Sequence, residues 1–365
     1  MKRSYLLLTL FTSVLLVLGF VFIYSAGISM EARLPYLSAR DFLTKQLIAF
    51  VIGLIAAVIT VHIKSSTHFK NVFYVYYPAI IFLLVTVLLF PSRGGSHRWI
   101  ELGGFSLQVS EFAKVVLIMA LAKYFGWIEE KNLNFLRTFI IPLLIAAPFI
   151  FLVFIEPDLS TTGLLILITL VMMFLGGIKI RHILLAVALT IVLIFAAYRL
   201  ELLKSYQIER FITFISSFRG QEHEQISYSL KAISAGGLFG TGLGMGTVKY
   251  YLPVSYSDFI FATIGEELGL VGIFLLMISY IGFVQKLVLI GLKVPKKKEG
   301  KLYIIGFAFY VMIQATINIA VNLGLFPPTG VTLPFVSYGG SSLISLLIGF
   351  AFVFSIILEK EEDHA

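Results

Sequence analysis

The stretch PVSYSDFIFATIGEELG, residues 253–269, begins an apolar run that is long enough to cross a membrane. Pro253 interrupts the preceding chain, and the run continues to Val284, which exceeds the roughly 20 residues that a spanning helix needs. Asp258 therefore falls where water meets hydrocarbon. Taken alone, it would be interpreted as a cap that favours the positive end of the helix.

Two more acidic residues follow on the same helix. Glu266 and Glu267 lie about 12 Å along the helix from Asp258, too deep for free surface charges, so they need partners or water. Gly265 and Gly269 form a small-residue face that predicts close helix packing around these acids.

The composition excludes a water-soluble globular protein. The 365 residues are 59% hydrophobic and 13% charged, and the mean hydropathy is +0.97. There is no cysteine, and the six histidines are scattered, so neither disulfides nor a protein metal cage is expected. The formal charge of +8 does not indicate nucleic acid binding, because in a membrane protein the placement of Lys and Arg matters more than their sum.

Apolar windows of spanning length predict an all-α integral membrane protein with ten transmembrane helices. The first window, which follows Lys2 and Arg3, is interpreted as an uncleaved span and not a signal peptide. The ten windows are 5–27, 46–63, 72–91, 108–125, 138–155, 159–177, 181–199, 258–284, 302–323 and 339–358.

The distribution of basic residues predicts the orientation. Sixteen Lys and Arg fall on short inner segments and five on short outer loops when the N-terminus is placed inside. This asymmetry predicts that both termini are cytoplasmic, that a large loop at about 200–257 between helices 7 and 8 is extracytoplasmic, and that Asp258 faces outward. Residues 1–365 then form a single polytopic membrane domain.

Several outer segments and helix ends carry further chemistry. Glu111 and Lys114 lie three apart on one helix face, where either a self-satisfying ion pair or a functional role is possible. The turn Glu156-Pro157-Asp158 is interpreted as a cap for the sixth helix.

The loops contain three further features. The 200–257 loop is longer than a connection requires, and amphipathic helical spacing recurs at 209–218 and 228–234. The glycine-rich run 236–246 lacks the strand and helix of a dinucleotide site, although its backbone amides could cradle a phosphate. The last loop, 326–342, is stiff, then glycine-rich and hydroxyl-rich, as expected for a cavity wall.

With these motifs the chain resembles the SEDS family, the RodA and FtsW peptidoglycan polymerases, over nearly its whole length. The motifs occur in the family's order: GGSHRWIELGGFSLQVSEFAK, EPDLST, KAISAGGLFGTGLG, YLPVSYSDFIFATIGEELG and LFPPTGVTLPFVSYGGSS. The usual PEAHTD is PVSYSD here, which changes Val254 and Tyr256 and leaves Asp258 in register. The usual proline before SEF is Val109. The last loop mixes features of both subfamilies and leans slightly to RodA.

The resemblance implies a bacterial cytoplasmic membrane protein whose active site faces outward. Its implied substrate is lipid II, the undecaprenyl diphosphate-linked disaccharide pentapeptide, and its implied partner is a single-span class B penicillin-binding protein. Asp258 falls on the family's essential aspartate, and Glu111 and Lys114 fall on its functional acidic and basic positions.

The implied reaction is an inverting glycosyl transfer. Asp258 is the candidate general base for the acceptor 4-hydroxyl, and the leaving diphosphate needs positive charge. A loosely held divalent cation, magnesium or manganese, could assist. The substrate-binding or supporting candidates are Arg93, Arg98, Glu111, Lys114, Arg210, Lys249, Glu266 and Ser341. Two alternatives are a lipid II flippase, whose acids should lie near the bilayer midplane, and a scaffold that only recruits the crosslinking protein.

Overall fold

The computed structural model describes residues 2–34, 36, 38–90, 98–102, 105–128, 134–200, 224–293, 295 and 297–362. Those residues form an α-helical, multi-pass membrane protein. The chain divides into two compact units, each built from three segments. Unit 1 comprises Met1–Ile52, Ile208–Lys286 and Val311–Leu343, and unit 2 comprises Gly53–Gln207, Leu287–Tyr310 and Ile344–Ala365.

Seven described helical segments are long and apolar enough to cross a membrane. They are Ser4–Arg33, Ala39–His62, Ser65–Val87, Leu136–Ile155, Ile260–Lys293, Lys298–Asn322 and Gly340–Glu359. The other three predicted spans coincide with α5 (Val109–Trp127), α7 (Leu159–Leu175) and α8 (Ile180–Arg199). The count of ten and the placement of the large loop stay predictions, as does the single domain.

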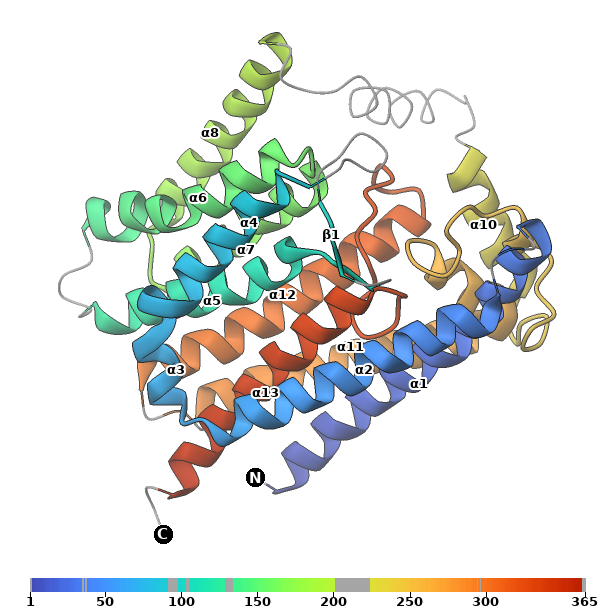
Figure 1. Ribbon diagram of the computed structural model, residues 1–365, viewed down its shortest axis with the longest axis horizontal. Helices are drawn as coiled ribbons and strands as arrows, with labels where there is room; N and C mark the ends of the chain where they lie inside the picture. The colour runs from blue at the N-terminus through green and yellow to red at the C-terminus, as the bar shows by residue number, and fades with distance from the viewer. Residues whose placement is uncertain are drawn as a thin grey trace. The chain divides into compact units, whose positions relative to one another are not determined.

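Unit 1 contains the turn that carries Asp258 and the elements around it. Its elements are α1 (Lys2–Arg33), the start of α2 (Ala39–His62), α10 (Glu224–Gly236), the short helix η4 (Val248–Tyr250), most of α11 (Ile260–Lys293), the end of α12 (Lys298–Asn322) and the start of α13 (Gly340–Glu362). Helices α1, α10 and α11 are labelled in Figure 1. The amphipathic helix predicted at 228–234 is confirmed by α10. The one predicted at 209–218 lies outside the described residues.

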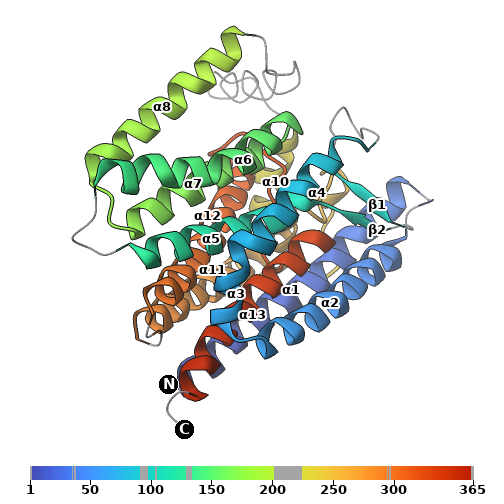
Figure 2. The same cartoon turned by 60° about the vertical axis from the view of Figure 1, so that its left-hand side comes forward.

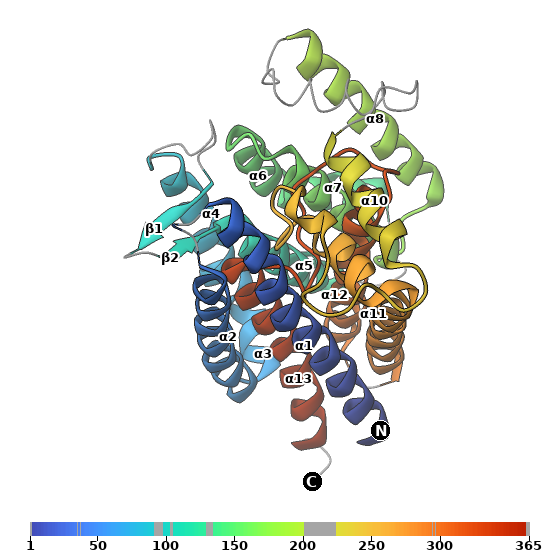
Figure 3. The same cartoon turned by 90° about the vertical axis from the view of Figure 1, so that its right-hand side faces the viewer.

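Helix α11 is interrupted at Gly269, where φ is +64° and ψ is −157°. The loop after α10 runs beside α11 (Figure 3). Thr241 N donates to Glu266 O at 2.9 Å, and Leu270 N donates to Gly237 O at 3.0 Å. The loop therefore pairs with main-chain groups on both sides of the interruption, as buried backbone requires.

The close helix packing predicted for Gly265 and Gly269 is found at Gly265, because a Cβ on Gly236 at the end of α10 would lie 1.9 Å from Gly265 O. Gly269 instead approaches a loop. A Cβ at Gly269 would lie 2.4 Å from Gly240 N, so the close approach is to the glycine-rich loop. Because φ is positive there, only glycine adopts the conformation without strain.

Unit 2 packs its helices around α5 (Figure 2). Its other elements are α3 (Ser65–Asn71), η1 (Val72–Tyr76), α4 (Tyr77–Val87), η3 (Leu136–Ile140), α6 (Ile141–Ile155), α7 and α8, with parts of α2, α11, α12 and α13. Helix α5 contacts α4, α6 and α7, and both Glu111 and Lys114 are buried in its first turns. The two charges therefore lie inside the helical packing of this unit.

A side-chain cap explains where α7 begins. Asp158 caps α7, because its Oδ1 accepts from Thr161 N at 3.1 Å, which confirms the predicted cap.

One feature was not predicted: strands β1 (Ile100–Leu102) and β2 (Phe105–Leu107) form an antiparallel pair just before α5.

Candidate active site

Asp258 lies in a turn just before α11, which begins two residues later than predicted, at Ile260. Its side chain is half-buried, and Ser257 Oγ donates to its Oδ1 at 3.1 Å. A Cβ on Gly330 would lie 3.7 Å from Oδ2. The carboxylate therefore lies beside the loop that was predicted to form a cavity wall.

The main chain at Asp258 is held by two asparagines that sequence reasoning missed. Asn318 Nδ2 and Asn322 Nδ2 donate to Asp258 O at 3.0 and 2.9 Å. Both residues are buried and lie one turn apart on α12. The available signal was the presence of two carboxamides in an apolar span, where polar side chains need partners.

Three aromatic rings pack beside the turn. Tyr256 lies 4.4 Å from Phe42 and 5.4 Å from Tyr338, measured between ring centroids. Burial, reinforced by the charge of Asp258, raises the pKa of the Tyr256 hydroxyl above its ordinary value of 10, so this ring stays neutral at physiological pH. Val254 has φ of +56°, a strained conformation for a β-branched residue.

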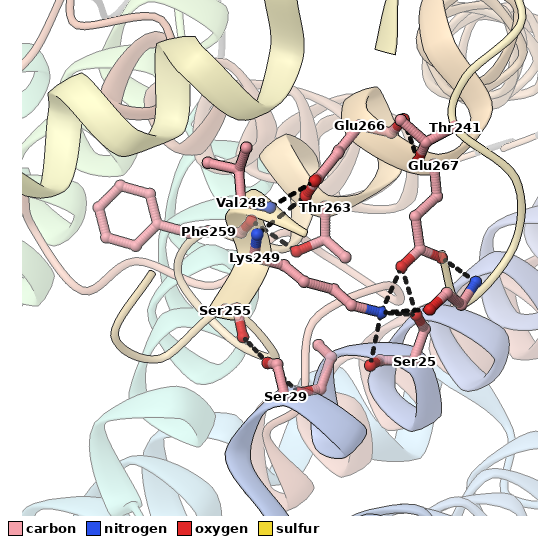
Figure 4. A network of polar contacts seen from close by, with 12 residues as sticks. Ser25, Ser29, Thr241, Val248, Lys249, Ser255, Phe259, Thr263, Glu266 and Glu267 are labelled. Atoms are coloured by element: carbon pink, nitrogen blue, oxygen red, sulfur yellow. Dashed lines mark hydrogen bonds and ion pairs between the residues drawn. The ribbon is translucent and has the colours of Figure 1, made fainter. Parts of the chain in front are cut away.

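The acids further along α11 have the partners that their depth requires. Glu266 accepts from the backbone amides of Val248 at 2.6 Å and Lys249 at 2.9 Å. Glu267 Oε1 accepts from Lys249 Nζ at 2.6 Å and from Ser25 Oγ at 2.5 Å (Figure 4).

The Lys249 ammonium is fully buried in this network. It donates to Glu267 Oε1, to Ser25 Oγ and O at 2.8 and 3.2 Å, and to Gly244 O at 3.3 Å. Both side chains of the Lys249–Glu267 pair have 0% exposure. An ammonium with four protein acceptors and no exposed surface is suited to stabilising the fold. It is less suited to binding a diphosphate.

The amides of the glycine-rich loop are also occupied. Gly242 N donates to Glu267 O at 3.1 Å, and Gly244 N donates to Glu267 Oε2 at 2.8 Å. These two amides bind α11 and the Glu267 carboxylate, so neither of them is available to a phosphate. Ser341 is buried in the first turn of α13.

A second polar cluster lies within unit 2. Lys114 Nζ lies 2.8 Å from Glu111 Oε1, and 5.3 Å from the centroid of the Tyr310 ring. Among the described residues, Glu111 Oε2 and the Tyr310 hydroxyl have no hydrogen-bond partner. The ion pair therefore leaves buried acceptor and donor capacity that an incoming polar group could use.

Arg98 joins the turn between α6 and α7. Its guanidinium donates to Pro157 O and lies 3.8 Å from Asp158 Oδ2. Neither carboxylate oxygen of Glu156 has a hydrogen-bond partner in the part of the chain that the structure describes. Burial and the Asp158 charge raise the pKa of Glu156 to about 8 against the opposing effect of Arg98. Arg93 and Arg210 lie outside the described residues.

No group of three or more His, Asp or Glu residues that could hold a metal ion occurs within the described ranges.

Comparison with known proteins decides the family. Residues 5–362 match the FtsW/RodA/SpoVE family, described as "Cell cycle protein". The chain belongs to the SEDS family. Among its curated SEDS relatives, a "Probable peptidoglycan glycosyltransferase FtsW" of Taylorella equigenitalis is 32% identical and covers 94% of this chain and 95% of the relative. Stage V sporulation protein E of Bacillus subtilis is 34% identical, with 94% of each chain covered.

Solved structures agree with the SEDS assignment. A chain of a peptidoglycan synthase complex, studied for the coordination of polymerization and crosslinking, superposes with a TM-score of 0.79 at 27% identity and 98% coverage of both chains. The rod shape determining protein RodA of Thermus thermophilus gives a TM-score of 0.71 at 27% identity, covering 97% of this chain and 96% of that one. Relatives therefore come from both FtsW and RodA subfamilies.

Proposed function

We propose that this SEDS protein polymerises lipid II into glycan strands, with Asp258 as the general base. The chain is a peptidoglycan glycosyltransferase, the activity for which its relatives are named. One observation supports the role of Asp258. Its carboxylate lies in the turn just before the apolar helix α11, whereas the deeper acids Glu266 and Glu267 are hydrogen-bonded to Val248 and Lys249.

The proposed chemistry is a single displacement. Asp258 accepts the proton of the acceptor sugar's 4-hydroxyl as the hydroxyl oxygen bonds to the anomeric carbon of the lipid-linked chain. The bond from that carbon to the diphosphate oxygen breaks, the configuration inverts, and the diphosphate leaves with the bonding electrons. General base catalysis of this kind contributes roughly 10²- to 10⁴-fold.

Positive charge for the leaving group is assigned to Lys114 and Arg98, with Arg93 and Arg210 as further candidates. The surroundings of Lys114 support its role, because its ammonium lies 2.8 Å from Glu111 Oε1 while Glu111 Oε2 has no hydrogen-bond partner among the described residues. Lys249 is assigned to positioning, since its ammonium is already saturated. Divalent magnesium or manganese would neutralise charge on the diphosphate if it takes part.

We also propose the cellular arrangement. The excess of Lys and Arg on the predicted inner segments supports cytoplasmic termini and an outward-facing Asp258 in the bacterial cytoplasmic membrane. The likeness to a chain of a peptidoglycan synthase complex supports a class B penicillin-binding protein as partner, in cell elongation or division.

The decisive experiment replaces Asp258 by Asn in purified protein with its partner and lipid II. Asn caps a helix about as well as Asp, so a role in capping alone predicts normal activity. A general base predicts a folded variant that binds lipid II and loses roughly 10²- to 10⁴-fold in polymerisation rate. The matched control is Asp41→Asn, an exposed aspartate in the first turn of α2.

Detergent removes the two compartments that flipping requires, so glycan made there demands an enzyme. Wild-type protein that makes no glycan with its partner would favour the flippase or scaffold. An Asp258→Asn variant as active as the Asp41→Asn control would refute the general base.

A further inference from the structure

We propose that Asn318 and Asn322 are positioning residues that hold the Asp258 carboxylate outside helix α11. This inference rests on the proposed role of Asp258. It extends that role to α12, because the carboxamides of Asn318 and Asn322 hydrogen-bond the main chain of the catalytic turn, residues 256–258.

Asn322 occupies the place of the first hydrogen bond of a longer helix. If α11 continued back through Asp258, Ala262 N would donate to Asp258 O, four residues earlier. Here the Asn322 carboxamide lies between those two groups. Its Nδ2 donates to Asp258 O at 2.9 Å, and its Oδ1 accepts from Ala262 N at 3.2 Å.

The inserted amide is itself fixed. Asn322 Nδ2 also donates to Asn318 O at 2.9 Å, and Ser229 Oγ donates to the main-chain carbonyl of Asn322 at 2.8 Å and lies 3.5 Å from its Oδ1. The Asn322 side chain is fully buried, so water cannot replace these hydrogen bonds when they are lost. Losing one would leave a buried polar group without a partner, which lowers the free energy of unfolding. The first turn of α11 is therefore held open by a rigid group.

Asn318 supplies the second donor to Asp258 O, at 3.0 Å, and with the same nitrogen donates to Val331 O at 2.7 Å. It thereby links the catalytic turn to the loop that lies beside the carboxylate. Two donors on one carbonyl oxygen use both of its lone pairs, which fixes the orientation of this peptide.

The two preceding carbonyls are held in the same way. Ser337 Oγ donates to Ser257 O at 2.6 Å, and Tyr338 N donates to Tyr256 O at 3.0 Å. Three consecutive carbonyls, at 256, 257 and 258, thus accept from groups outside their own segment. The position of the base is set by α12 and by the loop at 331–338, and not by the propensity of α11.

The test uses variants that separate donation from packing. Asn322→Asp keeps an acceptor for Ala262 N but cannot donate to Asp258 O when ionised, and Asn322→Leu removes both functions at similar volume. Asn318→Leu removes the second donor. The matched control is Tyr303→Phe, which deletes another buried side-chain donor of α12, one whose hydroxyl donates to Gly349 O at 3.0 Å.

Each variant is purified with the partner protein, and its melting temperature, affinity for lipid II, kcat and KM are measured. We expect kcat to fall by about 10²-fold in Asn322→Asp and Asn322→Leu, because an ångström of misplacement has that effect on a reacting group. Lipid II affinity should stay near that of the wild type. Tyr303→Phe should lose some thermal stability with its buried hydrogen bond and keep most of its kcat.

A folded Asn322→Leu variant with wild-type kcat overturns the proposal, because it lacks both the donor to Asp258 O and the acceptor for Ala262 N. If the Asn322 variants do not fold, Asn318→Leu decides by the same criterion against Tyr303→Phe. Failure of the general base itself is distinguishable, since it would show in Asp258→Asn, whatever the asparagine variants do.

Discussion

Breaking the buried pair Lys249–Glu267 should cost far more than deleting both of its charges together. Both side chains have 0% exposure, and the two charged atoms are 2.6 Å apart. Lys249→Met leaves a buried carboxylate with only the Ser25 hydroxyl and the Gly244 amide as donors. Glu267→Gln leaves a buried ammonium facing carbonyls. Each single change should lower the free energy of unfolding by about 3 to 5 kcal/mol.

The double variant Lys249→Met/Glu267→Gln buries no net charge. It still loses the hydrogen bonds of Lys249 to Ser25 O and Gly244 O, each worth about 1 kcal/mol, so a total cost of about 2 kcal/mol is expected. The coupling between the two sites should therefore be about 4 kcal/mol or more.

The assay is unfolding in mixed detergent and SDS micelles, followed by intrinsic fluorescence, for the four members of the cycle. The half-exposed pair Lys123–Glu299, at 3.4 Å, provides the control, for which about 1 kcal/mol or less is expected. Additive effects at Lys249 and Glu267, each as small as in the control, would refute the argument. A raised KM for lipid II in a folded double variant would restore Lys249 as a substrate ligand.

Two more predictions concern unit 2. Lys114→Met should lower polymerisation by about 10²-fold or more while the protein stays folded, because the leaving diphosphate loses a positive charge; unchanged kcat and KM would contradict this. Glu156 has a folded-state pKa of about 8 against its usual 4.5, so the folded protein holds this proton more tightly than the unfolded chain. The free energy of unfolding should therefore decline as the pH rises from about 4.5 to about 8. In detergent unfolding curves, Glu156→Gln should reduce this dependence of the free energy on pH. The same dependence in the variant and the wild type would count against the shifted pKa.

Local patterns in the sequence were sufficient for several features. The apolar windows located the helices, the Asp158 cap followed from the turn before α7, and the depth of Glu266 and Glu267 required the partners that the structure provides. Each of these depends on groups that are near in the chain or on the cost of burying a charge.

Other features depend on contacts between distant segments. Nothing near Asp258 in sequence indicates that Asn318 and Asn322 hold its carbonyl, sixty and more residues later. In the sequence, Gly269 looks like part of a small-residue helix-packing face. The structure shows a break in α11 there, which pairs with the loop at 237–242. Lys249 could be a substrate ligand until Ser25 and Glu267 are seen to enclose it.

The pairing of the glycine-rich loop with α11 has a mechanical consequence. Four hydrogen bonds, from Thr241, Gly242, Leu270 and Val271, join the segment after α10 to both sides of the break at Gly269 through main-chain atoms alone. A force on α10 is therefore transmitted to the first turns of α11 without depending on any side-chain rotamer. A protein that pushes or pulls on α10 from outside must either carry the entrance of α11 with it or rupture these bonds one after another.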